Sequence, residues 1–127
     1  MFDHVGYAVT DLEKAHAFYE KALAPLGYTV QMEITPEMTG AGAVTGFGID
    51  RPTLWIGESE KKVSGVHLAF TAKDRATVDA FYKAALDAGG TDNGKPGVRP
   101  HYHENYYGAF VLDPDGNNIE AVCHSPA

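Results

Sequence analysis

Strict alternation between apolar positions and small or polar ones predicts two short strands, at residues 2–9 and 65–72. On each strand the apolar face suits contact with a helix, and the opposite face holds one histidine among small residues. These histidines are His4 and His67. Because small neighbours leave space above a sheet, we expect a binding cleft over the histidine-bearing faces.

A helix is expected after each of these strands. Thr10 or Asp11 stands where the first helix needs an N-cap, and Asp74 stands in the same place before the second. Apolar residues then recur at helical spacing until Gly27 in the first helix and until about Ala88 in the second. Glycine follows both helices, as is common after a helix C-terminus.

Three strands are expected after each helix. In the first half they are residues 28–34, 43–49 and 52–58, which are rich in β-forming residues and separated by Pro or Gly. In the second half the strand pattern is weak between residues 90 and 108, whereas residues 109–124 form two β-rich runs around the turn sequence PDG. Each half therefore follows the order βαβββ.

The two halves are copies of one module. His67 lies 63 positions after His4, and several positions of the following helices match at the same displacement. We therefore expect a single domain over residues 1–127, built from repeats at about residues 1–60 and 64–127. A half of about 63 residues is marginal alone, so the halves should pack on one another or on the matching half of a second chain.

Composition limits the partners of the protein. The 127 residues include 10 Lys and Arg against 17 Asp and Glu, a formal charge of −7, which argues against nucleic acid and against an anionic membrane surface. No apolar stretch approaches the roughly 20 residues of a spanning helix, and the start, MFDHVGY, lacks the pattern of a signal peptide. Cys123 is the single cysteine and cannot form an internal disulfide. We expect a cytoplasmic protein that binds a small-molecule substrate.

A carboxylate on the last strand joins the two histidines. Alternation places Glu120 on the same face as Asn118 and His124, turned toward the cleft and away from the helix. A buried carboxylate needs a partner, and two imidazoles with one carboxylate form a facial set that holds a divalent metal. We therefore expect His4, His67 and Glu120 to bind iron, manganese, nickel or zinc and to leave positions open for substrate.

The doubled βαβββ order, the histidine at the start of each copy and the segment DPDGNNIEAV, residues 113–122, resemble the vicinal oxygen chelate superfamily. That superfamily includes glyoxalase I, extradiol dioxygenases, methylmalonyl-CoA epimerase and the fosfomycin and bleomycin resistance proteins. The resemblance implies an α+β fold in which the eight strands of two modules form a curled mixed sheet around a cleft. It also implies a divalent metal held at His4, His67 and Glu120, and a homodimer.

One position departs from glyoxalase I. When residues 52–58 are aligned with the last strand, Trp55 falls opposite Glu120, where glyoxalase I usually has a fourth ligand, a glutamate. Tryptophan cannot ligate a metal, so the three-ligand set resembles that of extradiol dioxygenases and of the fosfomycin-modifying transferases. Trp55 is expected either to form an aromatic wall of the cleft or simply to pack.

The connection at residues 95–108 concentrates histidine and tyrosine. Long connections of this kind are often functional, and histidine can move protons near neutral pH. The alternative is a surface loop with solvated histidines. The expected catalytic residues are Glu120, Tyr106 and His103. The expected substrate-binding residues are Trp55, His101, Tyr107 and Phe47.

Other conspicuous residues are expected to have no direct role. His16 falls on the polar side of the first helix and should be solvated. His124 is close to the C-terminus and is expected either to be solvated or, because it shares a face with Glu120, to support that residue. The glycines at residues 40–48 lack the order and the flanking elements of a nucleotide-binding loop, so we expect no dinucleotide.

Two functions fit the sequence. The first is a metal-dependent lyase, isomerase or ring-cleaving dioxygenase whose small substrate chelates the ion through neighbouring oxygen atoms. The second is a protein that sequesters a ligand without a catalytic metal, as the bleomycin resistance proteins do.

Overall fold

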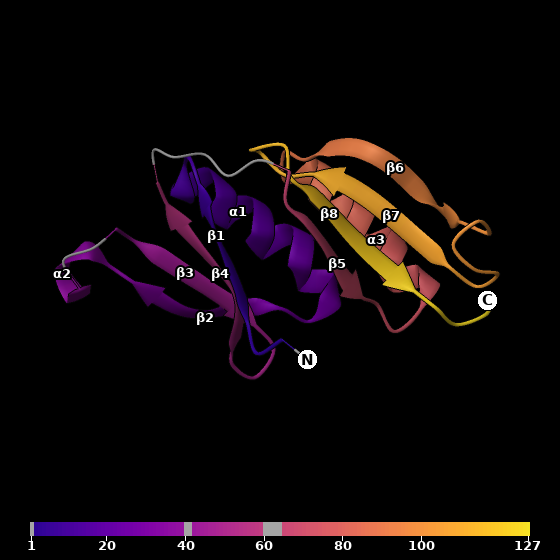
Figure 1. Ribbon diagram of the computed structural model, residues 1–127, viewed down its shortest axis with the longest axis horizontal. Helices are drawn as coiled ribbons and strands as arrows, with labels where there is room; N and C mark the ends of the chain where they lie inside the picture. The colour runs from indigo at the N-terminus through magenta and orange to yellow at the C-terminus, as the bar shows by residue number, and fades with distance from the viewer. Residues whose placement is uncertain (1, 40–41, 60–64) are drawn as a thin grey trace.

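The computed structural model describes residues 2–39, 42–59 and 65–127, which fold as two modules with related element orders (Figure 1). The first module contains β1 (Val5–Val9), α1 (Leu12–Leu23), the 3-10 turn Ala24–Leu26, β2 (Thr29–Ile34), α2 (Pro36–Thr39), β3 (Val44–Gly48) and β4 (Pro52–Glu58). The second contains β5 (His67–Thr71), α3 (Arg75–Asp87), β6 (Thr91–Val98), β7 (Tyr107–Leu112) and β8 (Asn118–Cys123). The short helix α2 is an addition to the predicted order.

Each module forms one mixed sheet covered by its helix. The strand orders are β1-β4-β3-β2 and β5-β8-β7-β6, with the first strand of each module parallel to the last and the other pairs antiparallel. The α+β class and the tandem modules are thus confirmed. The expected single curled sheet of eight strands is instead two four-stranded sheets, and no strand pair among the described residues joins them.

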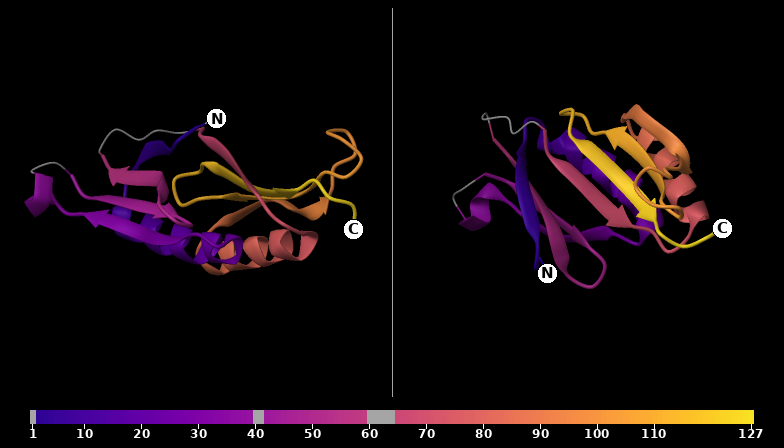
Figure 2. Two further views of the ribbon diagram at one scale, coloured as in Figure 1. Left: turned by 90° about the horizontal axis from the view of Figure 1, so that it is seen from below. Right: turned by 45° about the vertical axis from the view of Figure 1, so that its right-hand side comes forward.

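The modules meet through their helices. Helices α1 and α3 contact one another, and Figure 2 shows them together on one side of the molecule. An edge-to-face ring contact adds to this junction, between Tyr28 after the 3-10 turn and Phe70 on β5, with ring centroids 5.2 Å apart. Because the helix layer is shared and the sheets are not, each sheet keeps its own uncovered face.

Both predicted helix starts are confirmed in atomic detail. The Asp11 side chain accepts a hydrogen bond from the Lys14 amide at 3.1 Å, and the Asp74 side chain accepts one from the Thr77 amide at 2.8 Å. After α1 the chain reaches Gly27, whose φ of 87° requires a residue without a Cβ, so the first helix ends there as the sequence indicated.

The core lies between each sheet and its helix, on the apolar faces that alternation predicted. Its fully buried members include Val9, Phe18, Leu23, Leu54, Ile56, Val78, Phe81, Val111 and Ile119. Phe47 belongs to this core and not to a ligand-binding surface, because its side chain is 0% exposed and packs beneath α1 against the rings of His16 and Tyr19. Cys123 is also buried, as a small apolar residue would be.

A buried carboxylate connects the second module to the first. Asp113, in the turn between β7 and β8, accepts a hydrogen bond from the Tyr19 hydroxyl of α1 at 2.7 Å. It also accepts bonds from the amides of Asp115 and Asn117, at 2.9 and 2.8 Å. The Tyr19 hydroxyl is in turn hydrogen-bonded to that of Tyr7 on β1. The turn sequence that resembled a family motif therefore serves here as a junction.

Strand β6 confirms the strand that the repeat predicts between residues 90 and 108, where the local pattern is weak. Its sequence, TDNGKPGV, is polar and contains proline and two glycines, yet it pairs with β7 through two register shifts. It is the edge strand of its sheet and largely exposed, so it needs few apolar side chains. Among the described residues no helix is long and apolar enough to cross a lipid bilayer.

Tyr19→Phe is expected to lower the free energy of unfolding by about 1–3 kcal/mol, because a buried carboxylate loses one of its donors. Urea unfolding of the intact chain measures this. Tyr28→Phe is the matched control, since the Tyr28 hydroxyl makes no hydrogen bond found among the described residues. Equal losses in the two variants would contradict a stabilising link through Asp113.

The buried phenols of Tyr7 and Tyr19 should make the stability of the fold depend on pH in alkaline solution. Burial raises the pKa of Tyr7 and of Tyr19 above the ordinary value of 10.0. When the pKa of a phenol is higher in the folded state than in the unfolded state, its contribution to stability is complete below about pH 10. That contribution is lost as the pH rises toward the folded-state pKa. The free energy of unfolding should then fall by up to about 1.4 kcal/mol per pH unit for each phenol. Urea unfolding across this range should give a shallower slope for Tyr19→Phe, and an unchanged slope would refute the assignment.

Candidate functional site

A cavity of about 590 Å³ lies on the face of the second sheet that α3 leaves uncovered. Two groups of residues line it, one from the strands and one from the connection between β6 and β7. The strand residues are His67, Phe110, Asn118 and Glu120. The connection contributes His101, Tyr102, His103 and Tyr106. The structure thus brings together most of the polar side chains that the sequence singled out in this half.

The centre of the cavity is an imidazole–carboxylate pair. His67 Nε2 lies 3.1 Å from Glu120 Oε1, on neighbouring parallel strands. The Glu120 side chain is 2% exposed, whereas that of His67 is 49% exposed, so the carboxylate is reached from the cavity only past its neighbours. The predicted face of β8 is confirmed, because Ile119 and Ala121 lie in the core on the other side.

Tyr106 contacts the second oxygen of the Glu120 carboxylate, the one that does not face His67. Its hydroxyl donates a hydrogen bond to Glu120 Oε2. Burial, and then this bond, raise the pKa of the phenol, so Tyr106 stays protonated at neutral pH. The fit is close at Gly108 on the adjacent strand, because a Cβ there would stand 3.3 Å from Glu120 Oε2 and 3.2 Å from the Tyr106 ring and would require these side chains to move slightly.

Two further histidines form a stacked pair beside Tyr106. His103 Nε2 and His124 Nδ1 are 2.7 Å apart, so one of these nitrogens donates a hydrogen bond and the other accepts it. The centroid of each imidazole ring lies 5.4 Å from the centroid of the Tyr106 ring. Because His124 is near the C-terminus, a solvated side chain was one of the two expectations. Only the return of the chain beside residues 101–106 gives it a partner.

Tyr107 lies on the other side of the sheet. Its hydroxyl donates to Asp79 Oδ1 of α3 at 2.7 Å, and the Arg75 guanidinium stands 5.0 Å from its ring centre. On β7 Tyr107 shares a face with Ala109 and Val111, which lie in the core, so its side chain is directed toward the helix. Its expected role in substrate binding is not supported by this placement.

The corresponding face of the first sheet has different chemistry. Trp55 pairs with Gly6 in the register in which Glu120 pairs with Ala69, as the sequence alignment indicated. Its indole lies over Gly46, where an added Cβ would come within 2.9 Å of the ring. This wall is therefore apolar where the second module has its carboxylate.

His4 stands apart from the other predicted ligands in this chain. Its Nδ1 is 2.7 Å from Asp3 Oδ1, and Arg51 lies 3.3 Å from the same oxygen. The hydrogen bond from His4, and then the charge of Arg51, lower the pKa of Asp3. Across residues 2–39, 42–59 and 65–127, no three His, Cys, Asp or Glu side chains gather closely enough to hold a metal ion.

Comparisons with known proteins agree on one family. Residues 1–121 match the family model described as Glyoxalase/Bleomycin resistance protein/Dioxygenase superfamily. A glyoxalase/bleomycin resistance protein from Albidiferax ferrireducens T118 is 28% identical, with a TM-score of 0.78 over 97% of this chain and 98% of that one.

Two further structures share the fold at lower identity. A glyoxalase/bleomycin resistance protein/dioxygenase family enzyme from Burkholderia phytofirmans PsJN is 21% identical, with a TM-score of 0.71 over 97% of this chain and 98% of that one. Glyoxalase I from Zea mays is 18% identical, with a TM-score of 0.72 over 99% of this chain and 45% of that chain. A search of curated proteins finds no significant match.

Tyr106→Phe is expected to destabilise the fold by about 1–3 kcal/mol in urea unfolding, because the buried Glu120 carboxylate loses a hydrogen-bond donor. Tyr102→Phe is the control, since Tyr102 lines the same cavity, is 57% exposed and contacts its neighbours through its ring. A Tyr106→Phe variant as stable as this control would show that the Tyr106 hydroxyl does not satisfy the carboxylate.

Proposed function

The chain belongs to the Glyoxalase/Bleomycin resistance protein/Dioxygenase superfamily, and we propose that it is a divalent-metal-dependent enzyme. Its substrate would be a small molecule bound through two neighbouring oxygen atoms, and its reaction that of a lyase, an isomerase or a dioxygenase. The observation that carries the proposal is the Glu120 carboxylate, which is 2% exposed and faces His67 at 3.1 Å.

The donor set of the second module suits a divalent cation. A carboxylate withdrawn from water is costly unless a cation or donors compensate it, and within the described part of the chain Glu120 pairs with one imidazole and one phenol. Imidazole and carboxylate together suit iron, manganese, nickel and zinc. Such an ion would supply Lewis acidity that polarises a bound oxygen. His67 and Glu120 would hold it.

We propose that His4 completes the ligand set from a second copy of the chain. His4 is exposed on the first module and lies outside the His67–Glu120 pair within one chain. A homodimer that sets the first module of one chain over the second module of the other would bring the two half-sites together. The uncovered faces of the two separate sheets are suited to this arrangement.

The remaining side chains of the cavity would handle substrate and protons. Tyr106 carries a proton at neutral pH and could donate it, or a hydrogen bond, to an oxygen beside Glu120. The His103–His124 pair has a shared proton position next to that phenol and could accept a proton. His101 would bind substrate from the mouth of the cavity, and Trp55 from the apolar wall of the first module.

A ligand-sequestering protein is the second candidate. The placement of His4 away from the His67–Glu120 pair, and the apolar wall around Trp55, favour it. In that case a ligand would bind the cleft with an affinity that does not depend on the proposed metal ligands. For either function we propose a cytoplasmic location, which the acidic composition and the single buried thiol of Cys123 support.

Purified full-length protein is expected to bind manganese, nickel or zinc in isothermal titration calorimetry and to retain it in elemental analysis. His67→Ala and Glu120→Gln should each weaken binding more than about 100-fold, because each removes a ligand. His16→Ala is the control for loss of a histidine, since His16 is on α1 and packs against Phe47 in the first module, away from the Glu120 cavity. Metal binding that survives both ligand variants, or no binding by the wild type, would refute the metal site.

Complementation between variants tests the shared site. His4→Ala and Glu120→Gln should each lose metal binding as homodimers, whereas a mixed dimer would rebuild one intact site from the unaltered His4 of one copy and the unaltered Glu120 of the other. Metal content should therefore recover after the two variants are unfolded together and refolded. A site within a single chain gives no recovery, and a chain that stays monomeric in sedimentation excludes the shared arrangement.

A further inference from the structure

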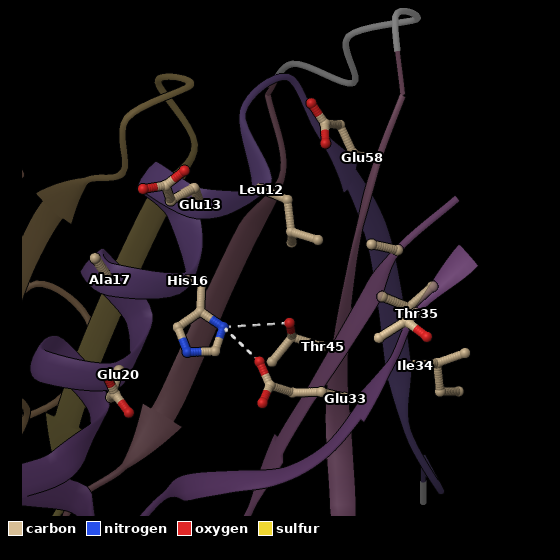
Figure 3. A pocket seen from close by; sticks show the side chains of 12 residues that line it. Leu12, Glu13, His16, Ala17, Glu20, Glu33, Ile34, Thr35, Thr45 and Glu58 are labelled. Carbon is tan, nitrogen blue, oxygen red and sulfur yellow. Dashed lines mark hydrogen bonds and ion pairs between the residues drawn. The ribbon is translucent and has the colours of Figure 1, made fainter. Parts of the chain in front are cut away.

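A second cavity, of about 530 Å³, lies on the first module, on the side of the sheet that carries α1 (Figure 3). It is bounded by α1 and by strands β2, β3 and β4. Trp55 and the face proposed to meet a second chain lie on the opposite side of this sheet. The cavity is therefore separate from the Glu120 site, and nothing proposed for that site uses it.

The two modules differ in how their helices cover their sheets. Helix α3 packs closely along β6, β7 and β8, whereas α1 is held mainly by α3 and the 3-10 turn and touches β2, β3 and β4 more sparsely. The hollow under α1 lies where the helix makes these sparser contacts with the sheet.

The interior of this cavity is mainly apolar. Leu12 projects from α1, and Ile34 and Val44 come from β2 and β3. His16 was expected to be solvated but is only 24% exposed and packs against Phe47. Its Nδ1 lies 3.3 Å from the hydroxyl of Thr45, which is 3% exposed. The imidazole of His16 and the hydroxyl of Thr45, at the floor of the cavity, therefore satisfy one another. The remaining lining suits the apolar part of a ligand.

The rim of the cavity is acidic. Four glutamates line it, and no lysine or arginine does so among the described residues. These glutamates are Glu13, Glu20, Glu33 and Glu58. Glu33 is nearest the floor, with Oε1 3.7 Å from His16 Nδ1, and its side chain is 62% exposed. With a formal charge of −7 on the whole chain, the rim attracts cations and repels carboxylates and phosphates.

We propose that this cavity binds a small organic cation with an apolar body, such as an alkylammonium. The ammonium group would lie at the glutamate rim near Glu33, and its alkyl body would cover Leu12, Ile34 and Val44. A volume of about 530 Å³ is in the range of small-molecule sites. Within the described residues, the glutamates of the rim are too far apart to hold a metal ion together. Their negative charge is distributed around the opening and therefore suits a larger organic cation.

Three ligands of equal chain length test the charge requirement: hexyltrimethylammonium, hexan-1-ol and hexanoate, titrated into the full-length protein. Calorimetry and amide and methyl NMR shifts follow binding. Hexyltrimethylammonium should bind most tightly and shift the signals of Leu12, Ile34 and Val44, and its affinity should fall as salt is raised. Hexanoate should bind weakest. Equal affinity for the three ligands, or shifts confined to the uncovered sheet faces that carry Trp55 and Glu120, would overturn the proposal.

Three variants locate the ligand. Glu33→Gln should weaken hexyltrimethylammonium about twofold to fivefold, since an exposed ion pair contributes little more than that. Glu104→Gln, on the exposed connection of the second module, makes the same change in net charge and should have no effect. Ala17→Leu, on an exposed helical position that lines the cavity, should narrow the cavity and weaken binding without loss of helix.

Each opposite result counts against the site. If Glu33→Gln and Glu104→Gln weaken the ammonium equally, only the overall charge of the protein is involved. If Ala17→Leu binds as the wild type does, the ligand is elsewhere. If the wild type binds none of the three ligands and Ala17→Leu changes the sedimentation of the protein, a second copy of the chain covers this cavity, and the small-molecule proposal fails.

Discussion

The structure depends on one buried carboxylate at the junction of its two modules. Asp113 is 4% exposed and receives hydrogen bonds from its own turn and from the Tyr19 hydroxyl of the other module. Asn117, which also donates to it, accepts a bond from the Val66 amide just before β5. The turn, the start of β5 and helix α1 are therefore held in one arrangement, and the position of the two sheets follows from it.

This arrangement gives the repeated modules unequal faces. The modules share a helix layer, so each sheet keeps an uncovered face, and the equivalent positions on those faces hold Trp55 in one module and Glu120 in the other. The second face carries histidines and a shielded carboxylate, whereas the first is an apolar wall. The junction also holds α1 against α3, and an acidic-rimmed hollow lies over β2 and β3, where α1 contacts the sheet more sparsely. The asymmetry of the repeat thus sets both proposed sites.

Side-chain direction along a regular strand could be predicted, and direction in the irregular parts could not. Alternation placed His67 and Glu120 on one face, and the structure brings them to 3.1 Å. The opposite orientations of Tyr106 and Tyr107 depend on where β7 begins, which the weak pattern before it did not reveal. Phe47 was misassigned because its burial comes from α1 lying over it.

The sequence by itself determined the local and periodic features. These are the repeat, the cap at Asp74 and the start of the first helix at Thr10 or Asp11, the register that opposes Trp55 to Glu120, and the family. These follow from contacts between residues near in the chain or from strict periodicity, so a linear pattern contains them. Only the tertiary structure decided that the sheets stay separate, that His4 lies apart from His67 and Glu120, and that His16 lines a cavity. Those outcomes depend on how two packed bodies meet, and that meeting is fixed by a few long-range contacts such as Tyr19 with Asp113, which have no periodic signature in the sequence.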